Sequence, residues 1–252
     1  MPDIVVSVIN DSSVVTDDAC RALTAALQKQ VSWDFAPVWG IDAKLVFVPK
    51  DQAPAKGTWW LSILDSTDRP GALGHHDLTP DGLPVGKSFA GTDLHYGFEW
   101  TVTASHELLE MLANPDINRA ILVRPEQGDA KLYAYEVCDP CEDDADSYAI
   151  DGIKVCNFLY PTYFESFHHA ATTKFDHQGR LKAPVPAVLP GGYISMYDLN
   201  GSAQWQQISN AAIEPDRRAR SQVAERHSSR RERRQLPRSE WKHAKVPERT
   251  AP

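Results

Sequence analysis

The sequence predicts an α+β fold, and three features of its hydrophobic pattern support this prediction. β-branched and aromatic runs predict strands at 3–9, 43–49 and 58–66. Apolar residues at helical spacing predict helices at 17–31 and 94–113. From residue 131 onward, short alternating runs return. Together these features predict an N-terminal mixed sheet with helices, a further helix, and then a β-rich half.

Composition and charge divide the chain into two parts. The 252 residues are 42% hydrophobic and 24% charged, which is typical of one globular domain. Residues 216–252 carry 12 Lys and Arg against 5 Asp and Glu, whereas residues 1–215 carry 14 against 29. Because the basic end has almost nothing to bury, we expect one domain over 1–210 and a disordered Arg-rich tail over 211–252.

The first helix and the strands around it have clear boundary signals. Thr16 and Asp17 are plausible caps for the helix at 17–31. Pro- and Gly-containing turns separate the strands at 43–49 and 58–66, and would suit hairpins or short crossovers. A sheet should therefore form before residue 70.

The segment 69–91 is rich in Gly and Pro, so we expect a loop with one short edge strand. It carries His75, His76 and Asp77, which we interpret as polar loop residues, although they could reach a site from that loop. The helix that follows should end at Asn114, since Pro115 disfavours a helical residue before it.

A motif with metal-binding spacing lies on this helix, in the stretch "SHELLE". Many zinc hydrolases carry H-E-x-x-H on a helix, and here a glutamate replaces the second histidine. Side chains at i and i+4 lie on one face, so His106 and Glu110 can converge on one ion while Glu107 flanks it. The alternative is a solvated helix face. The apolar neighbours favour a metal, because charged groups on a mostly buried helix need a partner.

A third ligand should come from the stretch "YEVCDP". Strand alternation predicts that Glu136 lies on a strand of aromatic and aliphatic residues, where a carboxylate is conspicuous, and that Asp139 lies where this strand runs into a loop. We expect one of them to bind the metal and the other to orient His106 through its second ring nitrogen.

With these residues in place, the sequence resembles the zincin-type metallopeptidases, in the form of an HExxE variant of HExxH. It is also similar to a group of uncharacterised bacterial and phage proteins with the layout "SHELLE … YEVCDP … NFLYPTYF". The resemblance covers residues 3–165. It implies a zincin-like fold in which the helix at 94–113 is the active-site helix. The implied function is metal-dependent hydrolysis of a peptide or protein, with Glu107 as general base toward a metal-bound water. Tyr163 or His76 would stabilise the oxyanion.

The ligand types also indicate which metal to expect. One imidazole and two carboxylates cancel the charge of a divalent ion, so the metal should acidify water less than in the three-nitrogen sites. We expect Zn²⁺, or alternatively Mn²⁺ or Fe²⁺, and a slow hydrolase. The other hypothesis is a non-catalytic, metal-stabilised binding or virion-associated protein on the same scaffold.

The location and partners follow from what the sequence lacks. The start has no basic region followed by an apolar run, and no stretch approaches the roughly 18 apolar residues of a membrane span. We expect a cytoplasmic or virion-associated protein with no membrane partner. The basic tail predicts at most a weak electrostatic contact with nucleic acid or an acidic partner.

The sequence also offers two alternative metal sites outside the helix motif. A Cys₃His structural zinc site would use Cys138, Cys141 and Cys156 with His168 or His169. Small buried thiols are the simpler interpretation. The acidic run at 139–148 could bind Ca²⁺, but it lacks the spacing of an EF-hand and is typical of a solvated turn.

Overall fold

A computed structural model of the chain describes residues 4–68, 72–124, 128–166, 168–169, 172–200 and 205–210. Within these residues the fold is α+β, as predicted. The tail expected over 211–252 lies outside the described residues, so the domain boundary at 210 stays a prediction. Among the described residues, no helix has the length and apolar composition needed to cross a membrane.

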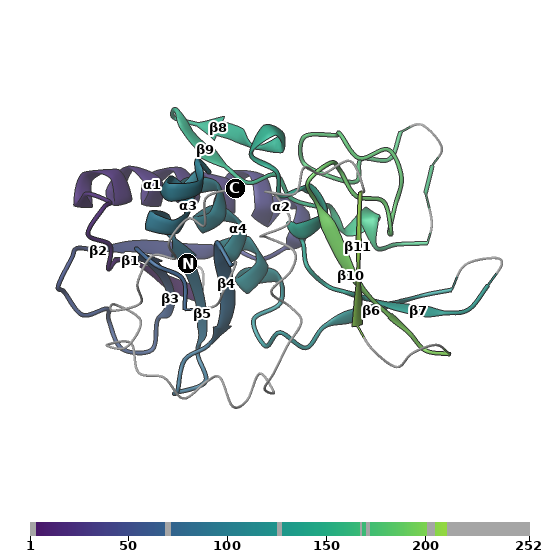
Figure 1. The fold of residues 1–252 in the computed structure, drawn as a ribbon, viewed down its shortest axis with the longest axis horizontal. Helices are drawn as coiled ribbons and strands as arrows, with labels where there is room; N and C mark the ends of the chain where they lie inside the picture. Colours follow the sequence, from purple (N-terminus) through teal and green to yellow (C-terminus); the bar gives the residue numbers. More distant parts are fainter. Residues whose placement is uncertain are drawn as a thin grey trace, which may run out of the picture.

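The N-terminal sheet is mixed, also as predicted. Its five strands lie in the order β2-β1-β3-β5-β4 (Figure 1). The bounds are β1 (Ile4–Asn10), β2 (Ala43–Val48), β3 (Trp59–Leu64), β4 (Gly74–Leu78) and β5 (Pro84–Phe89). The strands β2, β1, β3 and β5 run parallel, and only the edge strand β4 is antiparallel. Crossovers therefore join the first three strands, because parallel neighbours cannot be joined by a tight hairpin.

The first helix continues beyond its regular turns. Helix α1 (Asp17–Lys29) begins where predicted, with the Thr16 side chain accepting the N–H of Ala19. A π-helical turn (Gln30–Phe35) and α2 (Ala36–Trp39) follow it. The turn buries the Gln30 side chain, which donates to the Cys156 carbonyl at 2.9 Å and accepts from the Ser105 hydroxyl at 2.7 Å. This amide ties the end of α1 to the helix that carries the motif.

The segment 69–91 contains two strands rather than one. Strand β4 is the expected edge strand, but β5 lies inside the sheet, with every residue buried. Gly and Pro content concealed β5 because its proline occupies the first strand position, where a missing N–H is tolerated. His75 and His76 consequently lie on β4, which corrects their interpretation as loop residues.

The single helix predicted over 94–113 is two helices, α3 (Ala90–Tyr96) and α4 (Trp100–Ala113). Apolar spacing continues across both, so periodicity did not reveal the break, although Gly97 marks it. Helix α4 is buried along most of its length, including the predicted apolar positions Leu108, Leu109 and Leu112. One core cluster joins α1 and α4 to inward residues of β1, β2 and β3.

The second half is β-rich, as predicted. An antiparallel sheet in the order β11-β10-β7-β6 lies beside the first (Figure 1). It consists of β6 (Ala120–Val123), β7 (Lys131–Ala134), β10 (Tyr193–Asp198) and β11 (Trp205–Ser209). A hairpin of β8 (Tyr148–Ile150) and β9 (Ile153–Val155) turns at the predicted Asp151-Gly152. Short 3-10 turns occupy Asp139–Cys141, Asp144–Asp146 and Pro161–Tyr163.

Candidate metal centre

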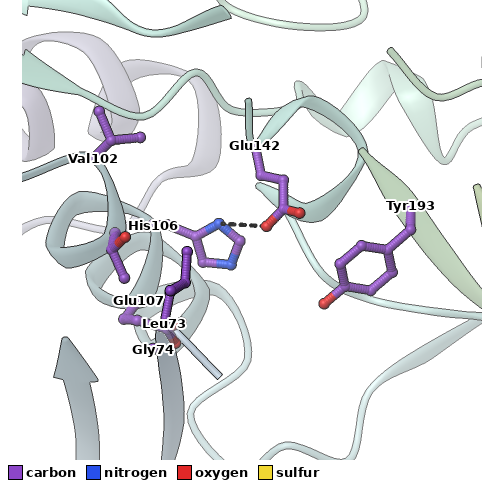
Figure 2. A pocket seen from close by; sticks show the side chains of 8 residues that line it. Leu73, Gly74, Val102, His106, Glu107, Glu142 and Tyr193 are labelled. Atoms are coloured by element: carbon purple, nitrogen blue, oxygen red, sulfur yellow. Dashed lines mark ion pairs between the residues drawn. The ribbon is translucent and has the colours of Figure 1, made fainter. Parts of the chain in front are cut away.

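Helix α4 presents its motif to a cavity of about 480 Å³ between the edge strand β4 and the second sheet. His106, Glu107 and Glu110 all line this cavity. Glu110 is only 1% exposed and Glu107 only 5%, so the motif is not a solvated helix face. A smaller cavity of about 50 Å³ adjoins it, where Tyr193 and Glu142 face His106 and Glu107 (Figure 2).

Three carboxylates surround His106. Its Nε2 lies 3.2 Å from Asp139 Oδ1 and 4.0 Å from Glu110 Oε1. Its Nδ1 lies 3.9 Å from Glu142 Oε2, as the dashed line in Figure 2 marks. Asp139 reaches this position because the chain enters a 3-10 turn directly after Cys138. The structure therefore brings the helix motif and one predicted downstream carboxylate together.

The other predicted carboxylate, Glu136, faces a second histidine. His76 projects from β4, with its Nε2 3.8 Å from Glu136 Oε2. Its Nδ1 lies 3.5 Å from Glu107 Oε2. Both histidines thus place each ring nitrogen within ion-pair distance of a carboxylate. His76 also lines the larger cavity, which corrects the expectation that it is an ordinary loop residue.

The predicted ligands are divided between two groups of metal-ligand type. His106, Asp139 and Glu142 form one, and His76, Glu110 and Glu136 form the other. In each group the ligand atoms lie within 4.8 Å of one another. These distances and the choice of donors would suit a metal ion.

The pKa values of this cluster reflect crowded negative charge. Burial raises the pKa of Glu110 well above its usual value, and the charges of Glu136 and Asp139 raise it further. Burial lowers the pKa of His106, but the interactions with Asp139, Cys156 and Glu107 outweigh it and leave the pKa well raised. The pKa of His76 is raised in the same way, by Glu107 and Glu136 against the effect of burial. A cation in the cavity would relieve this repulsion.

Two residues of the cavity wall, Glu142 and Tyr193, were not predicted from the sequence. Tyr193 begins β10, directly after Gly192, whose backbone packs against the turn that carries Asp139. A Cβ on Gly192 would lie 2.4 Å from the carbonyl oxygen of Pro140. Because glycine has no Cβ, β10 can lie directly against the turn that carries Asp139, and this contact places Tyr193 at the site. The pair Gly191-Gly192 is the only sequence signal for it.

Tyr163, named above as a possible oxyanion stabiliser, is not in the site. It is fully buried in the core of the second half, among Tyr133, Leu159 and Phe175. Its hydroxyl donates to the Ala187 carbonyl at 2.8 Å. The prediction that Tyr163 stabilises the oxyanion is therefore wrong. A 3-10 turn directs its side chain inward.

The residues of the rival Cys₃His zinc site do not come together among the described residues. All four cysteines are buried thiols outside any disulfide, and Cys138 and Cys156 group with His106. His168 is exposed and contacts the Thr162 carbonyl at 2.8 Å. Among the described residues, no group of metal-ligand type contains Cys141, His168 or His169. The Cys₃His site is therefore not formed.

The acidic run at 139–148 does not form a Ca²⁺ loop. Asp139 and Glu142 turn toward His106, whereas Asp146 pairs with Arg180. Asp143 accepts the N–H of Ala145 and caps a 3-10 turn. These carboxylates point to different partners instead of converging on one ion.

An ion pair network fixes the edge strand beside the site. Asp68 contacts His75 at 2.8 Å and accepts from Lys87 at 2.5 Å. Burial raises the pKa of Asp68, but the interactions with His75 and Lys87 outweigh it and hold the pKa well below its usual value. Close packing also holds the edge strand β4 against α4, since a Cβ on Gly74 would lie 2.6 Å from Glu107 Oε1.

Replacing Asp68 with Asn is expected to destabilise the fold by about 3 kcal/mol, because it removes the negative charge beside the buried Lys87. For a domain of this size that corresponds to a fall of roughly 6–12 °C in the midpoint of thermal unfolding. Asp81→Asn, at an exposed position between β4 and β5, is the control. Equal midpoints for the two variants would contradict the assigned role of Asp68.

Comparisons of the chain with known proteins assign it to no family. No family model matches the chain, and neither the curated proteins nor the solved structures include a significant match.

Proposed function

We propose that the chain is a metal-dependent hydrolase of zincin-like fold that cleaves a peptide or another amide. The observation that supports the proposal most strongly is the meeting of His106, Glu110 and Asp139 around the cavity, with Glu107 beside them. The order of elements also agrees with the resemblance, since a mixed sheet precedes a helix bearing His-Glu and an acidic ligand follows.

The residues present fit a divalent metal. One imidazole and two carboxylates suit Zn²⁺, Mn²⁺ or Fe²⁺. Glu110 Oε2 is a buried oxygen without a hydrogen-bond partner among the described residues, which is costly unless a cation compensates it. His106, Glu110 and Asp139 would hold the ion. When bound, it would polarise the substrate carbonyl and acidify a water molecule.

Glu107 would transfer the proton. Its carboxylate lines both cavities and would accept a proton from the water whose oxygen bonds to the carbonyl carbon. As the carbon–nitrogen bond breaks, Glu107 would give that proton to the leaving nitrogen. The carboxylate is then restored, and the two products are a carboxylic acid and an amine.

Tyr193 would stabilise the carbonyl oxygen as negative charge develops on it. Burial raises the pKa of its phenol well above the usual value, and the charges of Asp139, Glu142 and Glu136 raise it further. Tyr193 therefore stays protonated at neutral pH and remains a hydrogen-bond donor. In this role it replaces Tyr163.

Metal content tests the proposal directly. Elemental mass spectrometry on protein prepared without a histidine tag should find bound metal in the parent. We expect His106→Ala and Glu110→Ala to lower the affinity for the ion between them by about 100-fold or more, since each removes a direct ligand. Glu99→Ala, at the start of the same helix and outside the cavity, should bind as the parent does. A parent that binds no metal after incubation with Zn²⁺ or Mn²⁺ would contradict the proposal.

A further inference from the structure

We propose that the cavity holds two divalent cations that share the Glu110 carboxylate. The first would lie between His106, Asp139 and Glu110, and the second between His76, Glu136 and Glu110. This inference rests on the proposed function for the first ion. The second ion is assigned from His76 and Glu136, which lie outside the helix motif, together with the shared Glu110.

The two histidines have the same kind of surroundings. His106 directs Nε2 toward Asp139 and Glu110, while its Nδ1 faces Glu142. His76 directs Nε2 toward Glu136, while its Nδ1 faces Glu107. A histidine that binds a metal through one nitrogen commonly donates its other N–H to a carboxylate, which fixes the ring. The cavity contains this arrangement twice, on α4 and on β4.

Glu110 is placed to bridge the two ions. Its Oε1 lies 4.0 Å from His106 Nε2 and accepts the N–H of Cys138 at 2.6 Å. The same carboxylate also belongs to the group with His76 and Glu136. Glu110 Oε2, His76 Nε2 and Glu136 Oε2 are buried and have no hydrogen-bond partner among the described residues. These three atoms, from three elements of the chain, remain available for a second ion.

The charge of the cavity also favours two ions. The acidic side chains around the two histidines are Glu107, Glu110, Glu136, Asp139 and Glu142. One divalent ion would offset fewer than half of these carboxylates, all of which are largely buried. Two ions would leave a single carboxylate in excess, and that residue can be Glu107, which must be ionised to accept a proton. Buried anions without such compensation would be strongly destabilising.

The distances allow both ions to act on one substrate. The ligand atoms of His106, Asp139 and Glu142 lie within 4.8 Å of one another, as do those of His76, Glu110 and Glu136. His106 Nε2 of the first group lies 4.0 Å from Glu110 Oε1 of the second. In two-metal hydrolases the ions lie roughly 3.5–4 Å apart and stabilise the attacking and leaving atoms together. Each group supplies few protein ligands, so coordination positions remain for water and substrate.

Titration with Mn²⁺ alone tests the inference without requiring a substrate. Isothermal calorimetry on the full chain should give two equivalents in the parent. Electron paramagnetic resonance of the loaded parent should show the spin coupling of neighbouring Mn²⁺ ions. His76→Ala should bind one equivalent of Mn²⁺, and its spectrum should be that of uncoupled Mn²⁺. Its affinity for the second equivalent should fall by about 100-fold or more. Glu136→Gln, which changes little in shape, should give the same result.

His95→Ala is the matched control, since His95 is exposed on α3 and lines neither cavity. It should bind two equivalents and keep the coupled signal. A parent that binds one equivalent, with no coupling and no change in His76→Ala, would overturn the second ion and leave the proposed hydrolase standing. A parent that binds no Mn²⁺ and no Zn²⁺ would overturn both.

Discussion

Glu107→Gln is expected to lower kcat for amide hydrolysis by about 10²- to 10⁴-fold, the usual contribution of a general base. Glutamine has nearly the same shape but cannot take a proton from water. Its amide oxygen can still accept from His76, so the histidine should keep its orientation and the metal content should not change. The carboxylate is closely enclosed, as the close approach of Gly74 to Glu107 Oε1 indicates.

The measurement requires turnover and metal content on the same preparation. A library of quenched-fluorescence peptides would identify a substrate for the parent, and Glu99→Gln would control for loss of a carboxylate from this helix. If Glu107→Gln turned over as fast as the parent, Glu107 would not be the base. If the parent bound metal but cleaved no amide, the non-catalytic, metal-stabilised hypothesis would replace the hydrolase.

The helix and its motif could be predicted from the sequence because their signals are local. The spacing of His106 and Glu110 follows from the geometry of an α-helix, and the leucines beside them fix which face is buried. The stretch with Glu136 and Asp139 was also recognisable, since a carboxylate is unusual on a strand of aromatic and aliphatic residues. The strand itself is shorter than predicted, because β7 ends at Ala134 and Glu136 lies beyond it. How the three carboxylates Glu110, Glu136 and Asp139 are distributed between His106 and His76 was not predictable, because it depends on where β4 passes.

His76, Glu142 and Tyr193 show why the remainder of the site required a structure. His76 comes from a segment whose Gly and Pro content favours a loop, yet pairing with β5 makes it an edge strand along α4. Tyr193 is more than fifty residues beyond Asp139 in sequence and arrives through a backbone contact at Gly192. A glycine in the sequence can indicate that two backbone segments pack closely, but it does not indicate which second segment is involved.

Removing the metal is expected to lower the midpoint of thermal unfolding by roughly 8–16 °C. An ion present at about 1,000 times its dissociation constant stabilises the native state by about 4 kcal/mol, and each kcal/mol shifts the midpoint by roughly 2–4 °C at this chain length. Repulsion should enlarge the effect, because Glu110, Asp139 and Glu142 all lie within 4.0 Å of His106 and are each more than nine-tenths buried. Calorimetry with and without a chelator measures the shift, and excess Mn²⁺ should reverse it.

A variant that removes one of these charges separates metal stabilisation from repulsion. Without metal, Glu136→Gln should unfold at a higher temperature than the parent, since one carboxylate fewer faces Glu110 across the cavity. With metal bound, Glu136→Gln should unfold at a lower temperature than the parent, because the variant has lost a ligand. The double variant His106→Ala/Glu110→Ala should show no change on chelation. If the parent melted at the same temperature in both conditions, its buried carboxylates would be stabilised by protonation or by other partners, and the cavity would not be a metal centre.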